Sequence, residues 1–185
     1  VWRYYPEVVE SIEPKLRLLP ADTRTPNHSI WSHLDLATAF KAALEDGKGG
    51  TLLSFSIGPV QSFIEQARSL RDLWSGSYLL SWLTFAAMRP IIEVVGPTAV
   101  VFPALRGNAL CDRWLGTRLD TKRLSEAAGA RRGAVADTVL TASLPNTFLA
   151  LVPGGEAEEL GRAALASCRE EWVEIARATR DLLQK

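Results

Sequence analysis

Residues 54–83 read SFSIGPVQSFIEQARSLRDLWSGSYLLSWL. The apolar and hydroxyl residues at the start are typical of a strand, and the Gly-Pro pair at 58–59 then predicts a turn. Apolar residues next recur three or four positions apart, which predicts a helix from about Val60. Gly76 interrupts this pattern, and a second, nearly all-apolar helix is expected to run to about Val94.

Two further strands and one long helix follow this stretch. Residues 98–105 and 146–153 are apolar runs that predict strands, the second of them buried on both faces. Residues 154–185 have helical spacing, with acidic residues first and basic residues last, which suits the helix dipole. Strand, helix, strand, strand, helix is the βαββαβ order of a ferredoxin-like fold without its last strand. We therefore expect an α+β domain over 49–185, with an insertion between its second and third strands.

The first 48 residues predict a helical segment that precedes this domain. Its first short helix is interrupted by Pro14, and a second helix begins with Ser29 or Asn27 as its cap. The sequence DGKGG at 46–50 then ends the helix and provides a flexible joint. We place the domain boundary there.

Composition narrows the class of protein. Hydrophobic residues make up 47% of the 185 residues, which is enough for a sizeable core. The 21 basic and 21 acidic residues cancel, so a free-standing nucleic-acid binder, which needs a basic excess, is disfavoured. The two cysteines are far apart and form no zinc motif, and a reduced, cytoplasmic protein without a signal peptide or membrane span is expected. Because Met88 is the only methionine, we expect a piece of a longer protein.

The turn after the first strand is a candidate phosphate site. Gly58 would let a phosphate approach the backbone, and Gln61 and Ser62 offer side-chain donors beside a helix N-terminus. Neither of the glycine-rich motifs of nucleotide-binding proteins, GxxxxGK(S/T) and GxGxxG, is present. The spacing of the residues alone therefore favours a turn that binds no ligand. Arg71 is a further candidate for a phosphate contact, while the nearby pair Arg68–Asp72 has the spacing of a salt bridge.

Two other groups of residues suggest chemistry. His28, His33 and Asp35 would suit a metal-dependent phosphohydrolase, although a separation of five does not place both histidines on one helix face. The alternative is that these histidines cap, pack or face solvent. A basic run in the insertion would suit RNA or a partner protein, with a solvated surface as the alternative. Its basic residues are Arg113, Arg118, Lys122, Arg123, Arg131 and Arg132.

Four long blocks, in this order, resemble one known family. They are LPADTRTPNHSIWSHLDLATAF (19–40), SFSIGPVQSFIEQARSLRDLWSGSYLLSWL (54–83), FPALRGNALCDRWL (102–115) and ASLPNTFLALVP (142–153). The family is the large subunit, of the Cas-ten type, of the type III-B CRISPR effector or Cmr complex.

The resemblance implies a fold and a function. Such subunits have an HD-type nuclease domain that cuts single-stranded DNA, and two palm domains of ferredoxin-like fold related to polymerases and cyclases. With guide RNA and other Cmr subunits they capture target RNA, and the paired palms then convert ATP to cyclic oligoadenylate in antiviral defence. By this resemblance, residues 1–48 are the tail of the HD region and 49–185 are most of the first palm.

Departures from the family pattern limit what this piece can do. The metal-binding GGDD motif of the second palm and the His-Asp dipeptide are both absent, and Ile57-Gly58-Pro59 stands where related cyclases have a metal-binding Asp. The resemblance therefore implies a divalent metal on the second palm and a shared ATP site, with Gly58, Gln61, Ser62 and Arg71 contributing here. We expect these 185 residues alone to be catalytically silent. A purely structural docking module and an HD-type phosphohydrolase fragment remain the alternatives.

Overall fold

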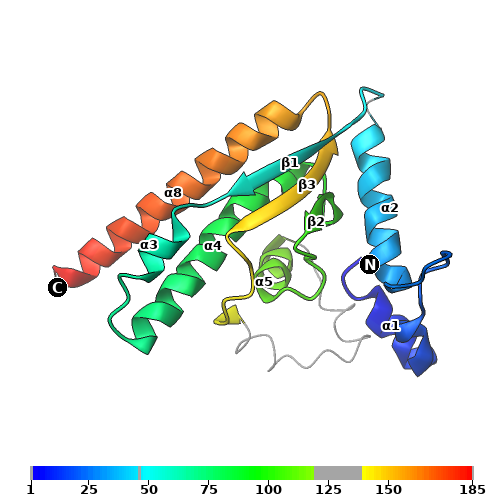
Figure 1. The fold of residues 1–185 in the computed structure, drawn as a ribbon, viewed down its shortest axis with the longest axis horizontal. Coiled ribbons are helices and arrows are strands. Elements are labelled where there is room, and N and C mark those ends of the chain that lie inside the picture. Colours follow the sequence, from blue (N-terminus) through cyan, green and yellow to red (C-terminus); the bar gives the residue numbers. More distant parts are fainter. Residues whose placement is uncertain (1, 46, 119–138, 185) are drawn as a thin grey trace.

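The computed structural model describes residues 2–45, 47–118 and 139–184. Helices and strands form an α+β arrangement with one small sheet (Figure 1). No helix among the described residues is both long and apolar enough to cross a membrane. The elements are α1 (Tyr5–Ile12), the 3₁₀ helix η1 (Pro14–Leu18), α2 (Ile30–Leu44), β1 (Gly50–Ser56), α3 (Val60–Ile64), α4 (Leu70–Val94), the 3₁₀ helix η2 (Pro97–Ala99), β2 (Val100–Phe102), α5 (Ala109–Arg118), β3 (Thr147–Pro153) and α8 (Ala157–Leu183).

The sheet has three strands in the order β1-β3-β2, and β3 is antiparallel to both neighbours. Leu53 lies opposite Ala150, and Phe55 opposite Phe148, in the β1–β3 register. The second strand is much shorter than the predicted 98–105. Proline at both ends explains this, because Pro97 starts η2 and Pro103 has no N–H to continue the ladder.

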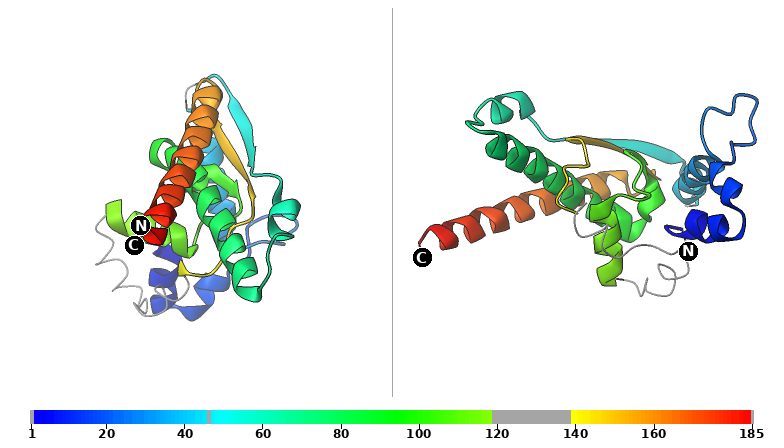
Figure 2. Two further views of the ribbon diagram at one scale, coloured as in Figure 1. Left: turned by 90° about the vertical axis from the view of Figure 1, so that its left-hand side faces the viewer. Right: turned by 90° about the horizontal axis from the view of Figure 1, so that it is seen from below.

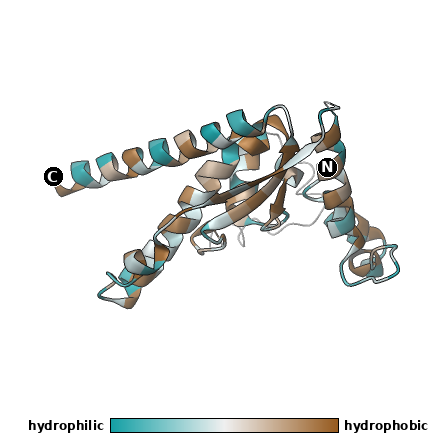
Figure 3. Cartoon of the chain, turned by 45° about the horizontal axis from the view of Figure 1, so that its top comes forward, coloured by the Kyte–Doolittle hydropathy of each residue, from teal (hydrophilic) through white to brown (hydrophobic). Residues whose placement is uncertain are grey.

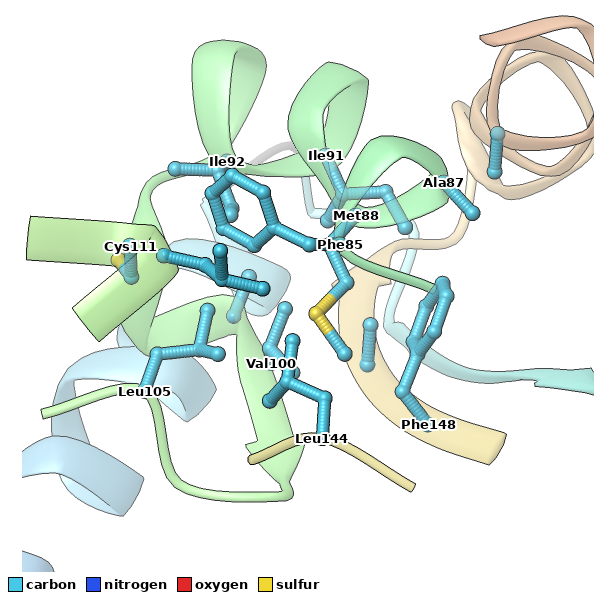
Figure 4. Packing of buried hydrophobic residues seen from close by; sticks show 14 of the residues in the cluster. Phe85, Ala87, Met88, Ile91, Ile92, Val100, Leu105, Cys111, Leu144 and Phe148 are labelled. Atoms are coloured by element: carbon cyan, nitrogen blue, oxygen red, sulfur yellow. The ribbon is translucent and has the colours of Figure 1, made fainter. Parts of the chain in front are cut away.

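Helices α4 and α8 cover one face of the sheet and enclose the main core (Figure 1). Met88 and Ile91 of α4 meet Phe148 of β3 there, and all three are fully buried (Figure 4). Full burial of a side chain of this size contributes about 1.5–3 kcal/mol relative to leaving it in water. The core therefore depends on the second half of α4.

The break in the helical region lies before Gly76, and not at Gly76 as predicted. Helix α3 ends at Ile64, and α4 begins after Ser69, whose side chain accepts the N–H of Asp72 at 3.1 Å. Gly76 lies within α4, where the absence of a side chain leaves room for the ring of Phe63; a Cβ at this position would lie 3.2 Å from that ring.

Pro90 is also accommodated inside α4. A proline has no N–H to bond the carbonyl four residues earlier, here that of Ala86. The hydroxyl of Ser167 on α8 donates to the Ala86 oxygen instead, at 2.8 Å. The helix can therefore continue to Val94, where the sequence predicted its end.

The N-terminal segment packs against the rest of the chain. Ser29, rather than Asn27, caps α2, because its side chain accepts the N–H of Ser32 at 3.2 Å. Ala39 and Ala43 of α2 then pack on Leu151, on the sheet face opposite the main core. Residues from both sides of the predicted boundary near 48 are thus in contact, and the boundary itself remains a prediction.

Two ion pairs link the N-terminal segment to the residues after the predicted boundary. They are crosswise, because the N-terminal segment supplies the cation of one pair and the anion of the other. Arg3 near the N-terminus donates to Asp112 of α5, with 2.6 Å between Nε and Oδ1, while Arg106 donates to Asp35 of α2. Trp2 adds a hydrogen bond from its Nε1 to Asp35, at 2.7 Å. Burial raises the pKa of Asp112, and the hydrogen bonds from Arg3 oppose that effect. We refer to these two pairs as the crosswise ion pairs.

Candidate functional site

The turn between β1 and α3 borders a cavity of about 480 Å³. Leu79 and Leu83 of α4 form one wall, and Trp172 of α8 forms another. Two polar side chains, Ser62 and Arg169, also line it. Its volume falls in the range of pockets that hold small molecules, and its mainly apolar lining with a few polar groups is typical of them. We call it the turn cavity.

Gly58 presents bare backbone to the turn cavity. The residue is exposed, and a Cβ built on it would have no atom within 4 Å. Its backbone is also outside the left-handed region that favours glycine. Neither packing nor conformation therefore requires glycine at this position, and its backbone is open to close approach by another molecule.

The helix after the turn differs from the expected one. Helix α3 covers only Val60–Ile64 and has no side-chain cap. Five residues align few peptide dipoles, so the predicted contribution of a long helix N-terminus to phosphate binding is weak here. Any anion at this turn would depend on the Ser62 hydroxyl and the Arg169 guanidinium.

The other two predicted nucleotide residues do not line the turn cavity. Gln61 is exposed and donates from Nε2 to Glu65 Oε1 at 3.1 Å. Arg71 is exposed in the first turn of α4. The predicted Arg68–Asp72 salt bridge is replaced by a bond from the backbone N–H of Arg68 to the Asp72 carboxylate, at 3.1 Å. Gly58 and Ser62 thus line the same cavity, whereas Gln61 and Arg71 do not.

Sequence reasoning did not assign to this site the three residues that α8 contributes, Cys168, Arg169 and Trp172. Trp172 is 48% exposed and lines the turn cavity. In the described part of the chain, no carboxylate forms a salt bridge with Arg169. Burial raises the pKa of the neighbouring Cys168 thiol, and Arg169 opposes that effect. No sequence pattern marks Arg169 among the other arginines of this helix.

The histidines show no metal geometry. The rings of His28 and His33 stack with their centroids 5.8 Å apart, and Asp35 is engaged by Trp2 and Arg106. Across residues 2–45, 47–118 and 139–184, no group of three or more His, Cys, Asp or Glu is placed to hold a metal ion.

The predicted basic surface is described only at its start. Arg118 ends α5, pairs with Glu93 at 2.9 Å, and lies over the ring of Trp114 at 5.4 Å from its centroid. The remaining predicted contacts, Lys122, Arg123, Arg131 and Arg132, lie outside the described residues. Their role in RNA or partner contact stays a prediction.

Comparison with known proteins finds one family in both the family model and the individual relatives. Residues 52–177 match the family model described as CRISPR-associated protein Cmr2, N-terminal. The chain is 34% identical over 200 residues to the CRISPR system Cmr subunit Cmr2 of Pyrococcus furiosus, which covers 98% of this chain and 21% of that protein. It is 35% identical over 118 residues to the CRISPR system CMR subunit Cmr2 of Saccharolobus solfataricus, which covers 62% of this chain and 11% of that protein. The chain thus spans about a fifth or less of the length of these curated relatives.

Proposed function

The chain belongs to the Cmr2 family, the large subunits of type III-B CRISPR effectors, and on that premise we propose that it forms the first palm-like domain of such a subunit. Within that domain, the turn cavity is one wall of an ATP site that a second palm completes. The paired palms would then make cyclic oligoadenylate when the complex, with its other Cmr subunits and guide RNA, captures target RNA.

The strand order supports the palm-like, ferredoxin-like part of this proposal. Strands β1 and β2 are both antiparallel to β3, so they run parallel to each other with β3 between them. Helix α4 provides the long crossover that joins them (Figure 1). Strand, helix, strand with one inserted antiparallel strand is the split βαβ unit of a ferredoxin-like fold.

The observation that carries the ATP proposal is the bare backbone of Gly58 at the turn cavity. The indole of Trp172 offers a surface for a base, and Ser62 and Arg169 offer donors to oxygen atoms. These residues fit the base and part of the phosphate chain. One arginine does not neutralise a triphosphate, and no carboxylate among the described residues lines this cavity, so in this proposal the second palm supplies the metal and the remaining phosphate contacts. Bound ATP would supply the adenylate that is joined into rings.

ATP binding to the full-length protein, measured by calorimetry, tests this proposal. We expect Gly58→Ala and Ser62→Ala each to weaken ATP binding by roughly three- to tenfold, because a methyl group blocks the backbone or a hydroxyl donor is lost. Gly161→Ala is the matched control: a Cβ there makes only an ordinary contact, 3.5 Å from Leu53, and Gly161 is not among the residues that line the turn cavity. Unchanged ATP binding in both turn variants, with normal thermal unfolding, would exclude a nucleotide at this turn.

A structural docking role is the second candidate, and the apolar lining of the turn cavity favours it. The first half of α4 and the last turns of α8 extend beyond the sheet (Figure 2) and carry apolar side chains (Figure 3). Leu73, Trp172 and Val173 are 39%, 48% and 42% exposed. If this role alone is correct, Trp172→Ala will reduce co-purification with the other Cmr subunits, while the turn variants leave ATP binding intact.

The RNA contact at the basic run is a further part of the proposal. Arg118 already pairs with Glu93, so removal of Arg118 alone should change RNA affinity little. Filter binding of target RNA to the assembled complex, with Lys122, Arg123, Arg131 and Arg132 all changed to Gln, tests the run as a whole. We expect the affinity to fall and to lose part of its salt dependence.

A further inference from the structure

A second cavity, of about 130 Å³, lies between α4 and α5. Among the described residues, none lines both this cavity and the turn cavity. The indoles of Trp82 and Trp114 and the guanidiniums of Arg89 and Arg113 line it, together with Phe85. Two indoles and two guanidiniums around one small cavity are the groups that proteins use for planar and anionic ligands.

The wall formed by Trp82 is held in place by α8. Trp82 Nε1 donates to Glu171 Oε1 at 2.7 Å, and Arg89 donates to the other oxygen of the same carboxylate. The side chain of Glu171 is only 14% exposed, so this ion pair is well shielded from water. Glu171 therefore fixes the indole of Trp82 and also neutralises Arg89.

The wall formed by Trp114 is held in a different way. Arg118 lies over its ring, 5.4 Å from the centroid, and Glu93 of α4 holds that guanidinium at 2.9 Å. Trp82 is thus positioned by a shielded carboxylate before any ligand arrives, whereas Trp114 is contacted by an exposed ion pair. A preorganised site of this kind avoids the entropy cost of ordering side chains on binding.

Arg113 differs from Arg89, the other arginine that lines this cavity. Among the described residues, no salt bridge involves Arg113, whereas Arg89 has Glu171. Arg113 also acts on the neighbouring tyrosine of α4: burial raises the pKa of Tyr78, and Arg113 opposes that effect. Within the described part of the chain, the cavity therefore presents two aromatic walls and one positive charge that has no salt-bridge partner.

We propose that this cavity binds a planar aromatic ring that carries a negative charge, with the ring against Trp82 and Trp114 and the anion paired with Arg113. The cavity is smaller than the dry cavity of about 150 Å³ that holds benzene, but it is open on one side, so a ring system can lie partly inside it with its charged group outside. A nucleoside monophosphate and an aromatic residue that bears a carboxylate both have this chemistry. The proposal is independent of the ATP site proposed at the turn cavity.

Photocrosslinking of the full-length protein with 8-azido-AMP, mapped to single residues by mass spectrometry, tests the proposal. We expect an adduct at Trp82 or Trp114 that falls roughly tenfold in Arg113→Gln, as expected for the loss of one charge-assisted hydrogen bond. Arg113→Lys should retain much of the adduct, because the charge remains. Arg177→Gln, an exposed arginine of α8, is the matched control and should change nothing. Gly58→Ala should also leave this adduct unchanged, which separates it from binding at the turn cavity.

Competition identifies the source of the ligand. Displacement of the adduct by AMP but not by N-acetyltryptophan supports a nucleotide, and the reverse supports an aromatic carboxylate. The inference is wrong if neither displaces it, if inorganic phosphate or the neutral N-acetyltryptophan amide displaces it equally well, if Arg113→Gln leaves it unchanged, or if no adduct maps to Trp82 or Trp114.

Discussion

The two halves of α4 have similar apolar sequences and opposite surroundings. No residue of the first half, Leu70–Leu80, is buried, whereas nine residues between Ser81 and Ile92 are. The difference comes from what covers each half, since β3, α5 and α8 enclose the second half and the first half extends beyond the sheet (Figures 1 and 2). Apolar periodicity thus predicted the helix but not the part of it that forms the core.

Both cavities lie where the two halves of α4 meet. The turn cavity uses Leu79, Leu80 and Leu83, and the second cavity uses Trp82 and Phe85. At this point α4 leaves the core. The side chains that line each cavity are therefore packed on the core side and exposed to solvent on the other side. This position gives each cavity rigid walls and an entrance.

The largest expected change in the free energy of unfolding comes from the loss of a core side chain in the second half of α4. Ile91 is fully buried, so Ile91→Ala should lower the free energy of unfolding by about 2–5 kcal/mol. Leu70→Ala is the control in the first half; Leu70 is 81% exposed, and its loss should change that free energy by less than about 0.5 kcal/mol. Urea denaturation measures both. Equal losses in the two variants would show that something covers the first half in solution.

Most of the fold followed from local patterns. The three strands and the helices α3, α4 and α8 were predicted in the right order from apolar runs and helical spacing, whereas α5 lies in the predicted insertion and was not predicted. The break before α4 was misplaced, since glycine is a poor helix former and sequence alone does not show the ring of Phe63 against Gly76. The length of β2 was overestimated because apolar residues continue past the point where Pro103 ends the pairing.

The site was less predictable than the fold. Gly58 and Ser62 are close in sequence, so a local pattern identified both. Arg169 and Trp172 reach the same cavity from more than a hundred residues away, and only the packing of α8 on α4 brings them there. The second cavity was not predicted for the same reason, because Trp82 and Trp114 meet only when α5 packs on α4.

A smaller change in the free energy of unfolding is expected when a buried hydroxyl is removed at the start of the second half of α4. Ser81 Oγ accepts the backbone N–H groups of Ser143 and Leu144, at 3.1 and 2.8 Å. Ser81→Ala would leave both donors without that partner and should cost about 1–3 kcal/mol of unfolding free energy. Ser77→Ala, in the first half of α4, removes only a hydrogen bond to the carbonyl of Leu73 in the same helix. It should therefore change the free energy of unfolding very little. If the two changes cost the same, the segment before β3 does not depend on α4.

The last comparison concerns the two cysteines and involves no change in the free energy of unfolding near neutral pH. Burial raises the pKa of Cys111 in the core to about 12, from a usual value of 9.0. Below pH 9 the thiol is neutral in both folded and unfolded chains, but above it the unfolded chain ionises first, so stability should fall as the pH rises from 9 towards 12. Comparison of Cys111→Ala with the parent protein isolates this contribution. At pH 8, a thiol reagent should label Cys168 at the turn cavity well before Cys111, and the opposite order would contradict the burial of Cys111.

The crosswise ion pairs limit where the protein can be shortened. Cleavage at the joint near residue 48 would remove Arg3 and Asp35 together, leaving Asp112, whose side chain is only 7% exposed, and Arg106 without partners. A buried charge that loses its partner typically destabilises a protein by about 3–5 kcal/mol, and the apolar contact of α2 with Leu151 would be lost as well. A trimmed version for crystallisation or NMR would therefore tend to aggregate, although it keeps every strand of the sheet. Residues 2–45 thus cover charged and apolar groups of the domain that would otherwise meet water.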